Sequence, residues 1–97
     1  MEFANAATEA IYNGESTKAS RRLLPDHLVG VARRKLIAIA VATKLDDLAA
    51  LPQNRLKKLS EGGRAGQYSI RINDQYRICF FWDPKVGATA VEIVDYH

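Results

Sequence analysis

The stretch that decides the fold is QYSIRINDQYRICFFW, residues 67–82. Apolar and polar side chains alternate with a period of two over residues 68–72, and the alternation returns over residues 76–82. This period is typical of half-buried β-strands. The polar residues 73–75 lie between the two runs, so the sequence predicts a β-hairpin with a three-residue turn.

The length of that turn fixes which side chains share a face. A slip of one residue would move every side chain to the other face, so a three-residue turn pairs Ile70 with Ile78 and Arg71 with Arg77. Like charges directly opposite each other are destabilising. The second face is therefore expected either to be an open surface that attracts phosphate or to receive a carboxylate from the last strand. The candidates for that carboxylate are Glu92 and Asp95.

Helices are predicted before the hairpin. Asn5 is a plausible N-cap for a helix from Ala6 to Tyr12, and apolar residues at helical spacing predict a longer helix from Pro25 to Thr43. The polar and basic stretch 15–24 between them is predicted to be a loop. The sequence Thr43-Lys44-Leu45-Asp46 resembles a capping box and predicts a short helix that Pro52 ends.

Further strands are predicted on both sides of the hairpin, at residues 55–60 and 89–96, with a loop at 61–64 and a turn at 83–87. Helices followed by a run of antiparallel strands predict an α+β fold. We expect N-terminal helices packed on one face of a mostly antiparallel sheet, in a single domain that spans residues 1–97.

Composition excludes several classes of protein. The 97 residues are 47% hydrophobic and 26% charged, which argues against disorder, and no apolar run is long enough to cross a membrane. One cysteine and two distant histidines cannot form a zinc motif, so no metal site is expected. A single cysteine also fits a reducing cytoplasm, where we expect the protein to act.

Basic residues are concentrated in two places. Residues 54–77 hold six bases and two acids, and Arg33-Arg34-Lys35 forms a second cluster in a chain of net charge +3. Local excess of this kind is the electrostatic footprint of a phosphate-rich partner. The alternative is an ordinary solvated face.

The chain ends on three titratable residues, Asp95-Tyr96-His97. An imidazole exchanges protons near neutral pH, an aspartate can orient it, and a tyrosine can donate a proton or stack on a base. In a regular strand Tyr96 points away from both of its neighbours, so the three can serve one site only if the strand bends. The alternative is a frayed terminus.

A basic sheet face beside an acid–base group suits metal-free cleavage of RNA. The reaction needs a base to deprotonate the ribose 2′-OH, cations to stabilise the pentavalent phosphorane and an acid to protonate the leaving 5′-oxygen. DNA lacks the 2′-OH, so this chemistry would select RNA.

The pattern R-x-G-x-x-S-I-R-x-N-x-Q-Y-R over residues 64–77, together with the terminal Asp95-Tyr96-His97, resembles the HigB branch of the RelE-like toxins. The resemblance implies a RelE-like microbial ribonuclease fold and metal-independent, cofactor-free cleavage of mRNA in the ribosomal A site. It also implies a cognate, HigA-like helix-turn-helix antitoxin, and operator DNA contacted only through the complex. The alternative is a catalytically weak RNA- or ribosome-binding module that acts mainly as antitoxin partner and co-repressor.

The resemblance also implies roles for individual residues. The catalytic candidates are His97, Tyr96, Asp95, Lys57 and Arg77, although Lys57 and Ser60 stand where some relatives have a histidine and a lysine. The bases expected to bind substrate phosphates are Arg64, Arg71, Lys58 and Arg55. The bases expected to contact ribosomal RNA are Arg33, Arg34 and Lys35.

Each assignment has a structural alternative. Arg77 could be a strand residue paired with Glu92, Lys57 an exposed edge lysine, and Arg64 a plain loop residue. The residues expected to be structural are Tyr68 and Trp82 in the core, Cys79 buried, and His27 in a structural or exposed position.

Overall fold

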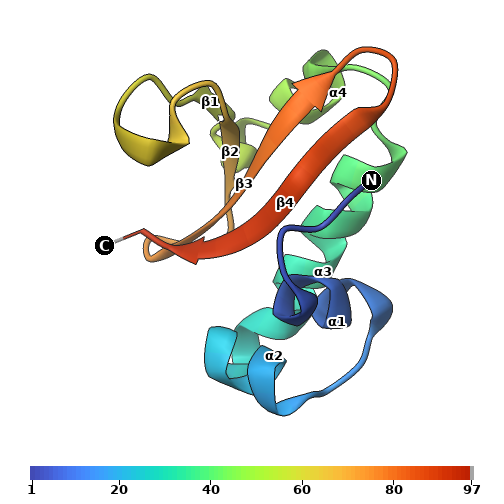
Figure 1. The fold of residues 1–97 in the computed structure, drawn as a ribbon, viewed down its shortest axis with the longest axis vertical. Helices are drawn as coiled ribbons and strands as arrows, with labels where there is room; N and C mark the ends of the chain where they lie inside the picture. The colour runs from blue at the N-terminus through green and yellow to red at the C-terminus, as the bar shows by residue number, and fades with distance from the viewer. Residues whose placement is uncertain (97) are drawn as a thin grey trace.

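The computed structural model describes residues 1–96, in which helices come first and a sheet follows. The helical elements are α1 (Ala6–Asn13), α2 (Lys18–Leu23), α3 (Asp26–Val41), α4 (Leu45–Ala49) and the 3₁₀ turns η1 (Pro52–Asn54) and η2 (Gly62–Arg64). The strands are β1 (Lys57–Lys58), β2 (Tyr68–Arg71), β3 (Tyr76–Asp83) and β4 (Gly87–Asp95), paired antiparallel in the order β1-β2-β3-β4. The expected α+β arrangement is confirmed (Figure 1). No helix in the described part of the chain is both long enough and apolar enough to cross a bilayer.

The register of the central hairpin is the predicted one. Ile70 pairs with Ile78 and Arg71 with Arg77. The Asn73 side chain closes the turn, because its Oδ1 accepts hydrogen bonds from the backbone N–H groups of Gln75 and Tyr76 at 2.9 and 2.8 Å.

The hydrophobic core lies between the helices and one face of the sheet. One stripe of α3 is buried, as its helical spacing predicts. In Figure 1, α3 runs diagonally along the sheet, and α1 and α2 gather at its lower end. Tyr68 stacks on Phe80 with 6.3 Å between ring centroids, and Trp82 packs against the same core, so both aromatic predictions are confirmed. The largest fully buried members of this core are Ile11, Leu24, Leu36, Ile39, Leu48, Ile70, Ile78, Phe80 and Ile93.

The prediction of a loop over residues 15–24 is wrong, because α2 occupies most of it. Thr17 and Ser20 cap this helix reciprocally: each side-chain oxygen accepts the backbone N–H of the other residue, at 2.9 and 3.0 Å. The following residue, Leu24, is buried in the core. The sequence signal for this helix is the capping box of Thr17 and Ser20. Apolar periodicity does not detect it, because no long apolar run follows the cap.

Two predictions near the end of α3 also change. The α3 helix ends at Val41, and Thr43 is exposed. The cap of α4 comes from Asp47 rather than Asp46, since its carboxylate accepts the backbone N–H groups of Thr43 and Lys44 at 2.9 and 3.3 Å. These hydrogen bonds lower the pKa of Asp47.

The strand predicted at residues 55–60 shrinks to the two residues of β1. Arg55 adopts a left-handed backbone conformation with φ of +46°, which no regular strand contains. At the other end the strand stops after Lys58. Leu59 is buried, and its backbone closes the loop of residues 60–66, because its N–H donates to Gln67 O and its carbonyl accepts the N–H of Gly66.

A hydroxyl in α1 fixes the helix layer to β4. Thr8 is fully buried, and its Oγ1 accepts the backbone N–H of Ile93 at 3.1 Å. Thr8→Val keeps the shape but leaves that buried N–H without an acceptor, so we expect the free energy of unfolding to fall by about 1–3 kcal/mol. Urea denaturation measures this, and Thr89→Val, at a half-buried threonine of β4, should shift it by less than about 0.5 kcal/mol. Equal effects of the two substitutions would contradict this role of the hydroxyl.

Candidate active site

A surface pocket of about 340 Å³ lies on the face of the sheet opposite the helices. Three predicted site residues line it from three different elements: Lys57 from β1, Arg64 from η2 and Tyr96 from the end of β4. Residues 57, 69, 79 and 92 are neighbours across the four strands, so their side chains share this face. The complete lining is Lys57, Leu59, Ser60, Glu61, Gly63, Arg64 and Tyr96. In Figure 1 the end of β4 lies on the same side of the molecule as the loop between β1 and β2.

The floor beside this pocket is a small apolar cluster of Leu59, Cys79 and Val94. The loop after Leu59 folds back on itself, because Leu59 N donates to Gln67 O at 2.7 Å and Gly66 N donates to Leu59 O at 2.9 Å. Cys79 is buried as predicted, and burial raises the pKa of its thiol. This packing holds the loop of Arg64 against the sheet.

Arg64 is held in place by two side chains. Its Nη1 donates to Glu92 Oε1 at 3.1 Å and to Gln67 Oε1 at 3.2 Å. The hydrogen bond with Glu92 raises the pKa of the guanidinium. Arg64 is therefore anchored, unlike a plain loop residue, and its Nε and Nη2 groups make no hydrogen bond to the described residues.

Arg77 lies beside the pocket and is held by neutral acceptors. Its Nε donates to Ser69 Oγ at 3.0 Å, and its Nη2 donates to the Arg55 carbonyl at 2.8 Å. The guanidinium carbon lies 5.7 Å from the centroid of the Tyr96 ring, within the range of a cation–π contact. Burial lowers the pKa of Arg77, and Arg71 and Arg55 lower it further. Within residues 1–96, no carboxylate forms an ion pair with Arg77, so the alternative pairing with Glu92 is wrong.

The other predicted phosphate ligands are placed differently. Arg71 is paired across the strands with Arg77, but its guanidinium forms an ion pair with Asp74. Asp74 was not among the expected counter-ions: Glu92 binds Arg64 instead, and Asp95 accepts a hydrogen bond from Gln75 at 3.0 Å. Arg55 is exposed, at the left-handed corner before β1.

Lys58 lies on the other face of the sheet from Lys57. It pairs with Tyr68, and its Nζ lies 5.7 Å from the centroid of that ring. Two consecutive strand residues point to opposite faces, so only Lys57 of the pair lines the pocket.

The C-terminal group is only partly within the described residues. Tyr96 N donates to Gln75 O at 2.6 Å, so β4 continues its ladder to this point without the bend that a shared site would need. Asp95 pairs with the core residue Tyr76, which places it on the opposite side of the sheet from Tyr96. The prediction for His97, and with it the contact between Asp95 and His97, lies outside the described residues.

The basic cluster of α3 separates in space. Arg33 Nε donates to the Tyr12 carbonyl at 3.1 Å, on the α1 side. Lys35 is half-buried, and its Nζ donates to Asn54 Oδ1 at 2.5 Å, toward the sheet. Arg34 is exposed, as is His27 near the start of the helix.

Two contacts of this region were missed from the sequence. The sequence predicted Glu92 as a possible partner of Arg71 or Arg77 rather than of Arg64, and it gave no prediction for the buried Gln67. The alternation of β4 contained a usable signal, since Glu92, Val94 and Tyr96 are spaced by two and share one face. Gln67 gave no signal, because its burial depends on how the loop folds.

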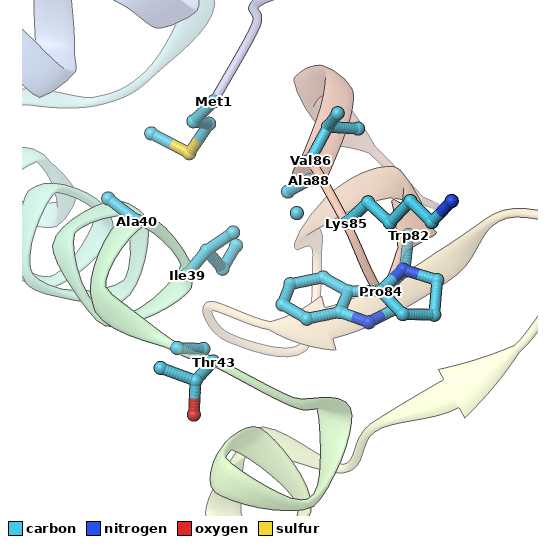
Figure 2. Close-up of a pocket in the computed structure, with 11 residues that line it drawn as sticks. Met1, Ile39, Ala40, Thr43, Trp82, Pro84, Lys85, Val86 and Ala88 are labelled. Atoms are coloured by element: carbon cyan, nitrogen blue, oxygen red, sulfur yellow. The ribbon is translucent and has the colours of Figure 1, made fainter.

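Two further pockets lie away from these residues. One, of about 300 Å³, opens between the end of α3 and the turn from β3 to β4, and Figure 2 shows the Trp82 ring and Pro84 facing Ile39 and Met1 across it. The other, of about 380 Å³, lies among α1, α2 and the start of α3. Neither contains a predicted catalytic residue, and no group of three potential metal ligands occurs within residues 1–96.

Comparison with known proteins gives the same answer as the motif. Residues 1–97 match the family described as RelE-like toxin of type II toxin–antitoxin system HigB. Toxin HigB-1 of Vibrio cholerae serotype O1 (strain ATCC 39315 / El Tor Inaba N16961) is 35% identical over 82 residues, which are 84% of this chain and 82% of that protein. Toxins of this class are paired with a cognate antitoxin, and the RelE-like group implies a ribonuclease-type activity. With fold, motif and both matches in agreement, the chain belongs to the HigB-like family of RelE-like toxins.

Proposed function

We propose that this toxin is a ribosome-dependent, metal-independent endoribonuclease that cleaves mRNA in the A site and so inhibits translation. The observation that carries the proposal is the pocket in which Lys57, Arg64 and Tyr96 meet, with Arg77 against the Tyr96 ring. Cations and a stacking ring around one concave site match what a phosphodiester and its flanking base require.

The reaction is a transfer of the phosphoryl group to the neighbouring ribose oxygen. The 2′-OH loses its proton, the 2′-oxygen bonds to phosphorus, the bond to the 5′-oxygen breaks, and that oxygen takes up a proton. The products are a 2′,3′-cyclic phosphate and a free 5′-OH. His97 is the proposed proton-transfer group, and Tyr96 is proposed to position or stack on a base. Asp95 lies on the opposite side of the sheet from Tyr96, so it has no role in the proposed reaction.

The cations have separable roles in this proposal. Lys57 and Arg77 form no ion pair within residues 1–96, which leaves their charge available to the phosphorane. Arg64 is already bound to Glu92 through Nη1, so it would donate to the phosphate through its remaining N–H groups. Glu92 then sets the direction from which Arg64 approaches.

Partners follow from the same proposal. The antitoxin is a HigA-like helix-turn-helix protein, and operator DNA is bound only through the toxin–antitoxin complex. The exposed Arg33, which lies on the α1 side of the molecule, contacts ribosomal RNA backbone. We propose that the protein acts in the cytoplasm, where its substrate is translated.

In vitro translation tests the function directly. The purified toxin should cut an mRNA only while ribosomes translate it, and a transcript with a single 2′-deoxyribose at the mapped cleavage position should stay intact there. Primer extension locates the 5′ ends. Cleavage of the deoxy-substituted bond would exclude the 2′-OH mechanism, and efficient cutting of naked RNA would indicate a free ribonuclease. No cleavage under any condition would favour the alternative, a non-catalytic partner of the antitoxin.

A further inference from the structure

Direct contacts connect the candidate active site to α3 around the edge of the sheet. Arg77 Nη2 donates to the carbonyl of Arg55 at 2.8 Å. The preceding residue, Asn54, accepts a hydrogen bond from Lys35 Nζ through its Oδ1 at 2.5 Å. A cation in the site and a cation on α3 are therefore attached to the same two-residue corner of the backbone.

This corner is rigid. Asn54 is fully buried, and its Nδ2 donates to the Leu48 carbonyl at 3.0 Å. Arg55 has a φ of +46°, a conformation that costs a non-glycine residue free energy and persists only where its surroundings enforce it. The Arg55 carbonyl, which accepts from Arg77, and the Asn54 side-chain amide, which accepts from Lys35, are thus held at a fixed distance and orientation from each other.

Positive charge around this corner exceeds negative charge. Arg71 lies directly opposite Arg77, and Arg34 neighbours Lys35 on α3. Burial lowers the pKa of Lys35, and the positive charges of Arg34 and Arg71 lower it further. Lys35 on α3 and Arg71 on β2 therefore repel each other across the edge of the sheet. Among residues 1–96 the acidic partner here is Asp74, which binds Arg71 and whose side chain is 96% exposed.

We propose that Arg34, Lys35, Arg55 and Arg71 form a basic track that holds backbone phosphates of the RNA strand outside the scissile bond. The proposal rests on the proposed function and extends its substrate contacts from the pocket to α3. It assigns Arg34 and Lys35 to the substrate strand, whereas Arg33 faces Tyr12 and is excluded.

A polyanionic strand fits this surface better than a protein partner does. Phosphates are contacted chiefly by arginine and lysine, and an anion between Arg71 and Arg77 would relieve their repulsion. A protein interface would be centred on apolar side chains. The most exposed large apolar residues, Val41 and Val86, lie at the end of α3 and in the β3–β4 turn, close to the pocket of Figure 2.

The salt dependence of RNA binding tests the track. The probe is a fluorescein-labelled single-stranded RNA of about twelve nucleotides with 2′-O-methyl ribose throughout, which the toxin cannot cleave. For Arg34→Gln/Lys35→Gln we expect about tenfold weaker binding and a slope of log affinity against log salt that is shallower by about 1.4, since each lost phosphate contact removes about 0.7. Fluorescence anisotropy across a salt series measures both quantities.

The matched control is Arg21→Gln/Arg22→Gln, which removes the same charge from the exposed face of α2. It should bind within about twofold of wild type if the contacts are local. If both double substitutions weaken RNA binding equally, the effect reflects only the overall positive charge and the basic track is contradicted. If Arg34→Gln/Lys35→Gln does not weaken RNA binding, the track is also contradicted. Unchanged RNA binding combined with lost antitoxin binding would make this surface a protein interface and also overturn the proposal.

Lys35→Gln removes a contact to a buried residue, so thermal unfolding of each variant is checked first. If that variant unfolds, Arg34→Gln/Arg55→Gln replaces two exposed side chains and tests the same track. The probe measures binding without cleavage. A negative result in the RNA-binding assay therefore does not change the outcome of the cleavage assay. If the cleavage assay is negative, the RNA-binding assay can still be interpreted.

Discussion

Arg77→Gln is expected to lower the rate of ribosome-dependent mRNA cleavage by about 10²–10³-fold. The Arg77 guanidinium is half-buried beside the pocket, and within residues 1–96 no carboxylate forms an ion pair with it. A preorganised cation of this kind stabilises developing negative charge without first leaving a counter-ion. Glutamine preserves much of the side-chain length and can still donate a hydrogen bond, but it removes the charge. Single-turnover cleavage on programmed ribosomes measures the effect.

The control for this substitution is Arg22→Gln, which makes the same chemical change on exposed α2. It should leave the cleavage rate within about twofold of wild type. Arg77 also donates to Ser69 and to the Arg55 carbonyl, so the thermal midpoint of Arg77→Gln must be measured alongside the rate. A folded variant that cleaves at the wild-type rate would remove Arg77 from the site.

His97→Gln is expected to reduce cleavage by about 10²–10⁴-fold and to abolish growth arrest when the toxin is induced without its antitoxin. Glutamine keeps a polar side chain but cannot exchange protons near neutral pH. Mapping the 5′ ends of cellular mRNA after brief induction measures cleavage in the cell. Wild type should generate new ends inside translated regions, and the variant should not.

His27→Gln is the matched control, because His27 is exposed on α3 and distant in sequence from the pocket. It should arrest growth as wild type does. If His97→Gln is as toxic as wild type, the assignment of proton transfer is wrong. If Arg77→Gln is inactive while His97→Gln is active, proton transfer must be assigned to another group in the pocket, with Tyr96 the first to replace.

The sheet and its register were readable from the sequence because they depend on local periodicity. The spacing of two leaves one register in which residues 68, 70 and 72 share the core face with residues 76, 78 and 80, and the structure has that register. The long helix was readable for the same reason, since its apolar stripe recurs at helical spacing. α2 was missed because its signal is a two-residue cap rather than an apolar stripe.

The sequence by itself determined the α+β fold, the opposition of Arg71 and Arg77, and the family. Only the tertiary structure decided which charges meet. Glu92 binds Arg64 rather than Arg77, and Arg33 and Lys35 of α3 bind to Tyr12 and Asn54 in different parts of the molecule. The physical reason is range. Periodicity records which face a side chain takes, whereas an ion pair depends on where a folded loop brings a residue 28 positions away, and no local pattern encodes that distance.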